Sequence, residues 1–170
     1  MTIRAETEAD RDAIWALDVA AFGDQLAADL VDTIRRTNRF IPELSLVAER
    51  DGEIVGHAML SFVDVEPGSH RILQLGPLAV KPAEQRKGVG TALMNEAIKL
   101  AEKRKEPMIL IEGDPRYYGR FGFERADRSG IEPPEGAHGP QYFMLRPLSS
   151  YDPALRGRAI YPPETFGTVS

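Results

Sequence analysis

The sequence predicts an α/β protein in which helices cover both faces of a mixed sheet. Two apolar runs flank Asp51-Gly52, a dipeptide that favours a hairpin because both of its turn positions take positive φ. Further along, an apolar run ending at Val80 leads into an amphipathic helix and then a second apolar run, which is the pattern of a βαβ crossover. The 170 residues suit one domain, which typically holds about 100–200 residues.

The N-terminal region predicts one short strand, residues 2–5, followed by two helices. Thr7 and Asp10 form a variant capping box, which indicates a helix running to about Phe22 and ending at Gly23. Asp24 can cap the second helix. In both segments apolar residues recur at helical spacing: Ile14, Leu17 and Ala21, then Ala27, Leu30, Val31 and Ile34.

The remaining segments alternate between strand and helix patterns. A helix is expected from Gly88 to about Lys105, and a short one between Pro115 and Phe121. The glycine- and proline-rich stretch 126–140 predicts a loop, and residues 149–170 an extended tail. Strands are expected over 45–50, 53–63, 71–80, 108–112 and 141–148.

Composition argues against several functional classes. A net charge of −5 does not suit a nucleic-acid binder, which usually has a basic face. With no cysteine there is no disulfide, thiolate metal site or cysteine nucleophile, and we expect no metal. Glu6, Glu8 and Asp10 stand where a signal peptide needs an apolar stretch, and no apolar run approaches the ~18 residues of a membrane span. We therefore expect a cytoplasmic protein with no membrane partner.

The segment Gln85-Arg86-Lys87-Gly88-Val89-Gly90 stands between the strand ending at Val80 and the long helix. Helix starts carry N–H groups without helical partners, and glycines let a phosphate approach the backbone. The residue order fits neither a Walker loop, whose lysine follows the glycines, nor a dinucleotide fingerprint, since Leu93 occupies the place of the third glycine. The segment thus predicts a phosphate site for another ligand; the alternative is an ordinary strand-to-helix turn.

Gly76-Pro77 interrupts the strand before this turn. Proline has no N–H to donate, so within a sheet it marks a bulge or an edge. A bulge would release the backbone groups of Leu78, Ala79 and Val80 from regular pairing and let an extended ligand bind there as an added strand. The alternative is a local distortion of an edge strand.

Two motifs in this order resemble the GNAT N-acetyltransferase superfamily. Residues 85–90 are similar to its Q/R-x-x-G-x-G/A signature, and Tyr118-x-x-x-Gly122-Phe123 is similar to its Y-x-x-x-G-F element. Residues 75–123 resemble a bacterial subgroup of predicted acetyltransferases, whose C-terminal extension is similar to the tail here in Leu155-Arg156-Gly157, Tyr161-Pro162-Pro163 and Phe166. The resemblance implies the GNAT fold, of class α/β (α+β), with a mostly antiparallel sheet splayed between two parallel strands, 71–80 and 108–112. It also implies an acyltransferase domain over 1–148 and an extension over 149–170 packed on it.

The resemblance further implies acetyl-CoA as co-substrate and a direct attack of the amine on the thioester. The absence of a nucleophile motif agrees with direct attack. Tyr118 takes the position of the family's general acid beside the departing sulfur; the alternative is a packing aromatic. The residues implied to bind the co-substrate are Leu78, Ala79, Val80, Gln85, Arg86, Lys87, Gly88, Val89, Gly90 and Thr91.

The reference pKa values of tyrosine, about 10, and of a thiol, about 8.5, make full proton transfer from Tyr118 to the thiolate uphill by roughly 2 kcal/mol. A hydrogen bond to the developing thiolate is therefore at least as favourable as protonation.

The general base departs from the family pattern. Some family members carry a glutamate where this chain has Gln74, and glutamine cannot accept the amine proton. A water chain, His57, His70 or Glu43 are the alternatives. Ile111 stands where many members have a CoA-contacting asparagine, so we expect that contact to be missing. The departure at Gln74 motivates a second hypothesis, a non-catalytic acyl-CoA-binding regulatory module.

The acceptor expected from the resemblance is an amine of a small molecule or a peptide. Segments 22–45 and 126–140 vary in the fold and are expected to border its pocket. An acidic rim would attract a cationic amine, although a run of charge is usually a solvated face. Dimerisation is common in the family, so a homodimer is compatible with the resemblance. The acidic residues of the two segments are Asp24, Asp29, Asp32, Glu43, Glu132 and Glu135.

Overall fold

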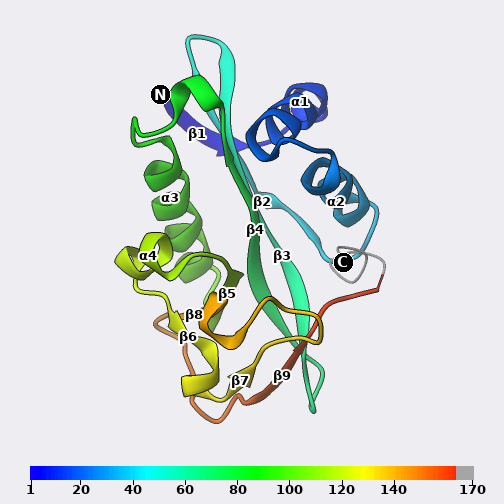
Figure 1. The fold of residues 1–170 in the computed structure, drawn as a ribbon, viewed down its shortest axis with the longest axis vertical. Coiled ribbons are helices and arrows are strands. Elements are labelled where there is room, and N and C mark those ends of the chain that lie inside the picture. The colour runs from blue at the N-terminus through cyan, green and yellow to red at the C-terminus, as the bar shows by residue number, and fades with distance from the viewer. Residues whose placement is uncertain (164–170) are drawn as a thin grey trace. The chain divides into compact units, whose positions relative to one another are not determined.

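Helices and strands fill most of residues 1–163, the part of the chain that the computed structural model describes (Figure 1). The chain forms two compact units. The first holds Met1–Ser61 and Gly76–Leu100, and the second holds Phe62–Leu75 and, within the described part, residues 101–163. Three elements have residues in both units: β3 (Glu53–Glu66), β4 (His70–Val80) and α3 (Val89–Lys103).

The first unit contains an antiparallel sheet of β1 (Thr2–Ala5), β2 (Phe40–Arg50) and the beginning of β3. β2 and β3 meet in a tight hairpin. At its turn Asp51 and Gly52 take φ values of 53° and 78°, both positive, as this type of turn requires. The predicted hairpin is confirmed, and both of its strands extend beyond their predicted bounds.

Two helices follow β1 and lie side by side, α1 (Arg11–Phe22) and α2 (Leu26–Arg35) (Figure 1). The predicted capping box at Thr7 is present, but it begins a short 3-10 helix that leads into α1. Gly23 ends α1 in the left-handed conformation, as predicted. Asp24 accepts a hydrogen bond from the N–H of Leu26 at 2.9 Å, so it helps to begin α2.

Two neighbouring residues of β3 show that different helices cover the two faces of this sheet. Gly56 lies against α3, where a β-carbon built on it would meet Val89 Cγ1 at 2.7 Å and Leu93 Cδ1 at 2.8 Å. Successive residues of a strand face opposite sides. His57 accordingly reaches α1, with its Nδ1 at 3.4 Å from Asp18. The predicted placement of helices on both faces is therefore confirmed for the first unit.

The second unit is organised around β5 (Met108–Glu112). β5 pairs in parallel with β4, with Gln74 opposite Leu110, and antiparallel with β8 (Phe143–Pro147), which also pairs with β6 (Glu124–Arg125). α4 (Pro115–Tyr118) follows β5. The parallel pair predicted between 71–80 and 108–112 is present. The apolar core of this unit contains Val63, Val65, Ile72, Met108, Leu110, Ala126, Ile131, Phe143, Leu145 and Ala159.

The C-terminal third has more regular structure than predicted. The expected loop over 126–140 contains the strand β7 (Ile131–Glu132), and the strand expected from Gln141 begins only at Phe143. Within the predicted extension, β9 (Gly157–Ile160) pairs with β3 and with β7. Strands this short have no readable period and form through distant partners, so local patterns do not reveal them. Phe166, on which part of the resemblance rested, lies outside the described residues.

The contact between Gly56 and α3 predicts a cost for any added side chain. We expect Gly56→Ala to lower the free energy of unfolding by about 1–3 kcal/mol, because the methyl group overpacks against Val89, whose χ1 is restricted in a helix. Urea unfolding measures this difference.

Gly119→Ala is the matched control, since Gly119 has a φ of −56° and a β-carbon there meets nothing within 4 Å. Its effect should stay within about 0.5 kcal/mol. Equal losses in the two variants would contradict the close packing at Gly56.

Candidate functional site

The predicted phosphate-binding turn precedes α3 in the first unit, and its residues 85–88 are exposed. The backbone takes positive φ at Arg86 (63°) and at Gly88 (86°). Left-handed residues in a turn direct successive N–H groups into one concavity that suits an anion. Since Arg86 is not a glycine, its left-handed conformation is unusual, and such conformations cluster at ligand sites.

Helical hydrogen bonding at this end of α3 begins with the N–H of Ala92, which donates to the Gly88 carbonyl at 3.0 Å. The N–H groups of residues 88–91 precede that ladder. Such groups lack helical acceptors and carry the partial positive charge of the helix start. The backbone of the turn can therefore hold a phosphate group.

Side chains around the turn add positive charge. Glu84 is ion-paired with Arg50 and lies 3.8 Å from Lys87 Nζ. Together with the exposed Arg86, this group contains three cationic side chains, those of Arg50, Arg86 and Lys87, and one carboxylate, that of Glu84. Its net positive charge favours an anionic ligand such as a pyrophosphate.

Only the first part of β4 pairs with β5. Its ladder with β5 ends at Leu75, although β4 itself continues across Gly76-Pro77 to Val80. Leu78 and Val80 are half-buried, whereas Ala79 is buried. The Gln85 side-chain amide donates to the Val80 carbonyl at 3.3 Å and so links the strand end to the turn. At the predicted interruption, the pairing of β4 with β5 stops, but β4 itself remains a continuous strand.

Tyr118 lies at the end of α4 in the second unit, and aromatic and backbone contacts hold its ring. A β-carbon built on Gly113 would meet Tyr118 Cε2 at 2.4 Å, so only glycine allows the ring to lie there. The ring centroids of Tyr117 and Phe123 are 4.9 and 6.0 Å away, both near edge-on. Burial, and then the neighbouring Tyr117, raise the pKa of Tyr118 to about 12. The phenol therefore stays protonated at neutral pH and can donate a hydrogen bond.

A polar network joins Gln74 of β4 to Glu112 at the end of β5. Gln74 Nε2 donates to the Tyr161 hydroxyl at 2.7 Å, and that hydroxyl donates to Glu112 Oε2 at 3.1 Å. Glu112 Oε1 also accepts the backbone N–H of His138 at 3.0 Å and lies 2.7 Å from His138 Nδ1. Burial is the main cause of a raised pKa at Tyr161.

Sequence reasoning singled out Gln74 but missed Glu112, Tyr161 and His138. The available signals were the acidic residue closing the apolar run 108–112 and the tyrosine within the subgroup-like tail. Neither signal indicates a partner, because the bonds join residues 26 to 87 positions apart.

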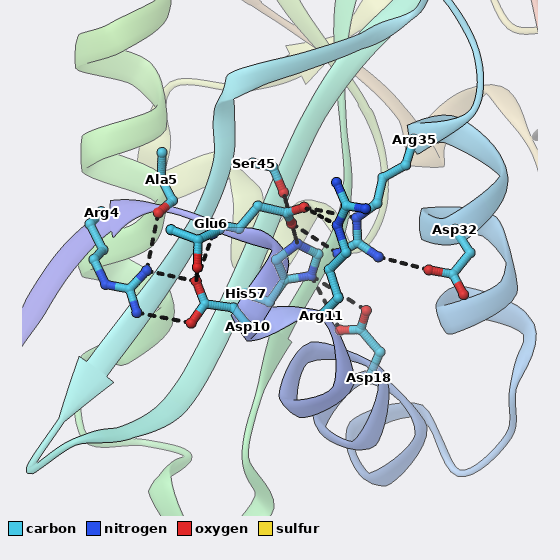
Figure 2. Close-up of polar contacts among 11 residues, drawn as sticks. Arg4, Ala5, Glu6, Asp10, Arg11, Asp18, Asp32, Arg35, Ser45 and His57 are labelled. Carbon is cyan, nitrogen blue, oxygen red and sulfur yellow. Dashed lines mark hydrogen bonds and ion pairs between the residues drawn. The ribbon is translucent and has the colours of Figure 1, made fainter.

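A second polar cluster is buried in the first unit between β1, β2, β3 and the two N-terminal helices (Figure 2). Arg35 donates to both carboxylate oxygens of Glu6 at 2.8 and 2.9 Å. The Ser45 hydroxyl donates to Glu6 Oε2 at 2.5 Å and lies 3.2 Å from His57 Nε2. On its other side His57 approaches Asp18.

Asp18, His57 and Ser45 have the composition of a nucleophilic triad, but the cluster cannot serve as one. All three side chains belong to residues with 0% exposure. The serine proton goes to Glu6 and not to the imidazole. A buried histidine in such a network holds the fold together, and His57 is therefore not the base that the sequence left open.

The other residues considered for the acceptor or the base have structural or surface positions. His70 is exposed at the turn between β3 and β4, against Gly68. Asp32 is ion-paired with Arg35 at 2.7 Å, Asp24 accepts the N–H of Leu26 at the beginning of α2, and Glu132 lies in the β7–β9 pair. The predicted acidic rim therefore consists in part of residues that the fold itself uses.

The chain resembles known proteins in sequence. The profile described as the Acetyltransferase (GNAT) family matches residues 11–123. An uncharacterized N-acetyltransferase of Escherichia coli (strain K12), YhbS, is 33% identical over 127 residues, which are 74% of this chain and 75% of that protein. A second uncharacterized N-acetyltransferase of the same organism, YjhQ, is 32% identical over 125 residues, which are 72% of this chain and 69% of that protein.

Solved structures resemble it in fold. The crystal structure of YhbS from Escherichia coli in complex with CoA has a TM-score of 0.88 at 27% identity, covering 96% of this chain and 90% of that one. A GNAT family acetyltransferase from Brucella melitensis in complex with acetyl-CoA has a TM-score of 0.79 at 28% identity, covering 96% of each. The predicted fold class is confirmed by these matches.

Within residues 1–163, no group of three or more histidine, aspartate or glutamate side chains is arranged to hold a metal ion. None of the helices in this part of the chain has the length and apolar character needed to cross a bilayer.

The cluster around Glu6 predicts a pH-dependent stability. Burial opposes ionisation of Glu6, but hydrogen bonds from Arg35 and Ser45 and the charge of Arg35 outweigh it and lower its pKa. A carboxylate with a lowered folded-state pKa stabilises the fold above its unfolded value, about 4.3, and loses that contribution as the pH falls. We expect Glu6→Gln to destabilise the fold by about 1–3 kcal/mol at pH 7.

The difference between wild type and Glu6→Gln should shrink progressively as the pH falls below about 4, because protons then bind the unfolded-state carboxylate and, below its lowered pKa, Glu6 in the folded protein as well. Urea unfolding at several pH values measures it. A difference that stays constant from pH 7 to pH 3 would show that the ionised form of Glu6 is not what stabilises the cluster.

Proposed function

Because this chain belongs to the GNAT acetyltransferase family, we propose that it transfers the acetyl group of acetyl-CoA directly to an amine of a small molecule or a peptide. The observation that carries the proposal is the turn before α3, with positive φ at Arg86 and Gly88 and with N–H groups ahead of the helical ladder. The CoA and acetyl-CoA complexes of the two related structures support the choice of ligand.

The residues that would hold the co-substrate fit its chemistry. The N–H groups of residues 86–91 and the cations Arg86 and Lys87 suit the pyrophosphate of CoA, which is anionic. Pantetheine carries amides along an extended chain, and backbone groups of Leu78 and Val80 beyond the end of the β5 ladder suit such amides. Val89 and Ala79 are buried and contribute backbone and packing to these two segments. Gln85 braces the turn through the Val80 carbonyl.

Acetyl-CoA supplies an acetyl thioester, and the protein has to place an amine against it and stabilise the charge that leaves on sulfur. With a pKa of about 12 at Tyr118 and about 8.5 for a thiol, proton transfer to the thiolate costs about 5 kcal/mol. The reference pKa values of tyrosine and a thiol gave a smaller cost for this proton transfer, roughly 2 kcal/mol. Tyr118 is therefore proposed to act by hydrogen-bonding the thiolate, and the proton that finally completes the thiol comes from solvent.

The turn yields a prediction about ligand affinity. Gly88→Ala places a side chain in the left-handed conformation, at a cost of about 1–2 kcal/mol, and should displace the N–H groups that face the phosphates. We expect the Kd for CoA, measured by calorimetry, to rise about tenfold.

Gly23→Ala is the matched control, because Gly23 has a similar φ of 79° and, like Gly88, open space around its Cα. Its stability loss should be similar, and its Kd for CoA should equal that of the wild type. A rise of equal size in both variants would mean that strain alone, and not the turn, sets the affinity.

The role of Tyr118 yields a second prediction. Tyr118→Phe keeps the ring contacts and removes the donor, so kcat should fall about 100-fold, as when a single oxyanion donor is lost, with little change in the KM for acetyl-CoA. Steady-state CoA release measures both constants. Equal kcat in wild type and variant would remove the proposed role of Tyr118.

The acceptor class is tested with a panel of polyamines, aminoglycosides, amino acids and peptides. Acetylation of at least one member is the expected result. The second hypothesis, a regulatory acyl-CoA-binding module, predicts tight CoA binding with no acetylated product from any of them. Gln74 is the observation that keeps this second hypothesis in the test, because its amide cannot serve as a base.

A further inference from the structure

We infer that Glu112 is the general base of the acetyl transfer, and that Tyr161 and Gln74 are positioning residues that hold its carboxylate. The inference rests on the proposed function and supplies what the sequence lacked, a group able to take the proton of the amine. It is carried by the bonds that join Gln74, Tyr161 and Glu112 within the second unit.

The orientation of the network follows from its chemistry. An ionised carboxylate only accepts hydrogen bonds, so the single proton of the Tyr161 hydroxyl is directed to Glu112. The hydroxyl oxygen must then accept from Gln74, which makes the nearer Gln74 atom its amide nitrogen. Gln74 here takes part in positioning a carboxylate on the neighbouring strand.

Glu112 also has room for a further donor. A carboxylate offers about four acceptor sites. Three contacts are made, by the Tyr161 hydroxyl and by the backbone N–H and ring of His138. The Glu112 side chain is 21% exposed, whereas the side chains of Glu6 and Asp18 are 3% and 0% exposed. A fourth site is thus open to the N–H of an amine that reaches the exposed side of Glu112.

The network also contains an unused acceptor, on Gln74. Gln74 Oε1 is buried and makes no hydrogen bond within the described residues. Leaving a buried acceptor unpaired is unfavourable, so such atoms call for an explanation, such as a ligand that supplies the donor. Gln74 Oε1 is thus an acceptor of this network that has no donor within residues 1–163.

The network also adjoins the tyrosine proposed to assist the leaving group. Gly113 directly follows Glu112, and its backbone lies against the Tyr118 ring. The end of β5 thus carries a proton acceptor, Glu112, next to a residue in contact with a hydrogen-bond donor, Tyr118. Acyl transfer to an amine is assisted by both, because the acceptor takes the proton of the nucleophile and the donor stabilises the thiolate that leaves.

The proton balance is complete with these groups. A protonated amine gives one proton to Glu112, and its free lone pair then forms the N–C bond to the acetyl carbon while the C–S bond breaks. The new amide nitrogen loses its remaining extra proton, and the thiolate gains one, both exchanged with solvent. Glu112 returns its proton to water through its exposed side, so one net proton is released for each protonated amine acetylated.

Glu112→Gln tests the inference, because the amide keeps the size of the side chain and cannot take a proton. Loss of a general base typically lowers the rate by about 10² to 10⁴-fold, and we expect kcat to fall by at least about 100-fold on an amine that is protonated at the assay pH. Glu124→Gln, a change at an exposed carboxylate of β6, is the matched control and should keep the wild-type kcat.

A second readout separates catalysis from a structural role. On an amine of low pKa, which is already unprotonated at the assay pH, Glu112→Gln should lose much less activity. A structural defect would lower the rate of acetylation of both amines by the same factor. The pH–rate profile of the wild type should have an acidic limb that is absent from the profile of Glu112→Gln. Within residues 1–163, the titratable side chains that contact Glu112 are His138 and Tyr161.

Tyr161→Phe keeps the carboxylate and provides a test if Glu112→Gln fails to fold. Loss of one hydrogen bond to a charged group should lower kcat about tenfold on the protonated amine, with the low-pKa amine again less affected. Wild-type kcat and pH profile in Glu112→Gln, or in Tyr161→Phe where only that variant folds, would overturn the inference and leave the proposed function intact. A wild-type protein that binds CoA but acetylates no amine would overturn both.

Discussion

The approach of α3 to the sheet at Gly56 is the contact on which the proposed co-substrate site depends. Because Gly56 has no side chain, Val89 and Leu93 lie directly on the strand, and Val89 is the first residue of α3. The helix start, with its exposed turn and free N–H groups, is therefore held close to the sheet. On the other face of the same strand, His57 belongs to a buried ionic cluster and contacts Asp18 of α1. One strand thus anchors the ligand-binding helix on one side and a purely structural network on the other.

The second unit concentrates its polar chemistry at the end of β5. Glu112 closes a strand whose other residues are buried. His138 and, in the segment after β9, Tyr161 contact it directly, and Gln74 of β4 is linked to it through Tyr161. The Tyr161 hydroxyl and the backbone N–H of His138 donate to the Glu112 carboxylate, while burial raises the pKa of Tyr118 and keeps its phenol protonated. A carboxylate that can accept a proton and a phenol that can donate a hydrogen bond are what removal of the amine proton and stabilisation of the thiolate require.

Local chemistry made most of the fold predictable. The Asp51-Gly52 turn, the Thr7 capping box and Gly23 as a helix end are each decided by a few adjacent residues, and each is present. The strands β7 and β9 were missed because their hydrogen bonds come from distant segments. Ala21 and Leu30 belong to the apolar residues predicted at helical spacing and are half-buried, whereas Asp18 and Met94 are buried. Periodicity locates a face of a helix but not the depth of each residue on it.

The site was predictable to the extent that it depends on contiguous motifs. Residues 85–88 form an exposed turn before α3, as expected, residues 89–90 begin that helix, and Tyr118 stands after β5. The residues around the base were not accessible in the same way. Gln74 could be recognised as a departure from the family pattern, but its bond to Tyr161 spans 87 positions and has no local signature.

The central claim is that the acetyl group passes directly from acetyl-CoA to an amine, and a single-turnover experiment tests it most directly. The protein is mixed with acetyl-CoA labelled in the acetyl group and with an acceptor amine, quenched at successive times and examined by mass spectrometry. The account predicts label on the amine nitrogen at a rate matching CoA release, and unlabelled protein at every time point. Label bound covalently to the protein, or free labelled acetate with unmodified amine, would contradict it.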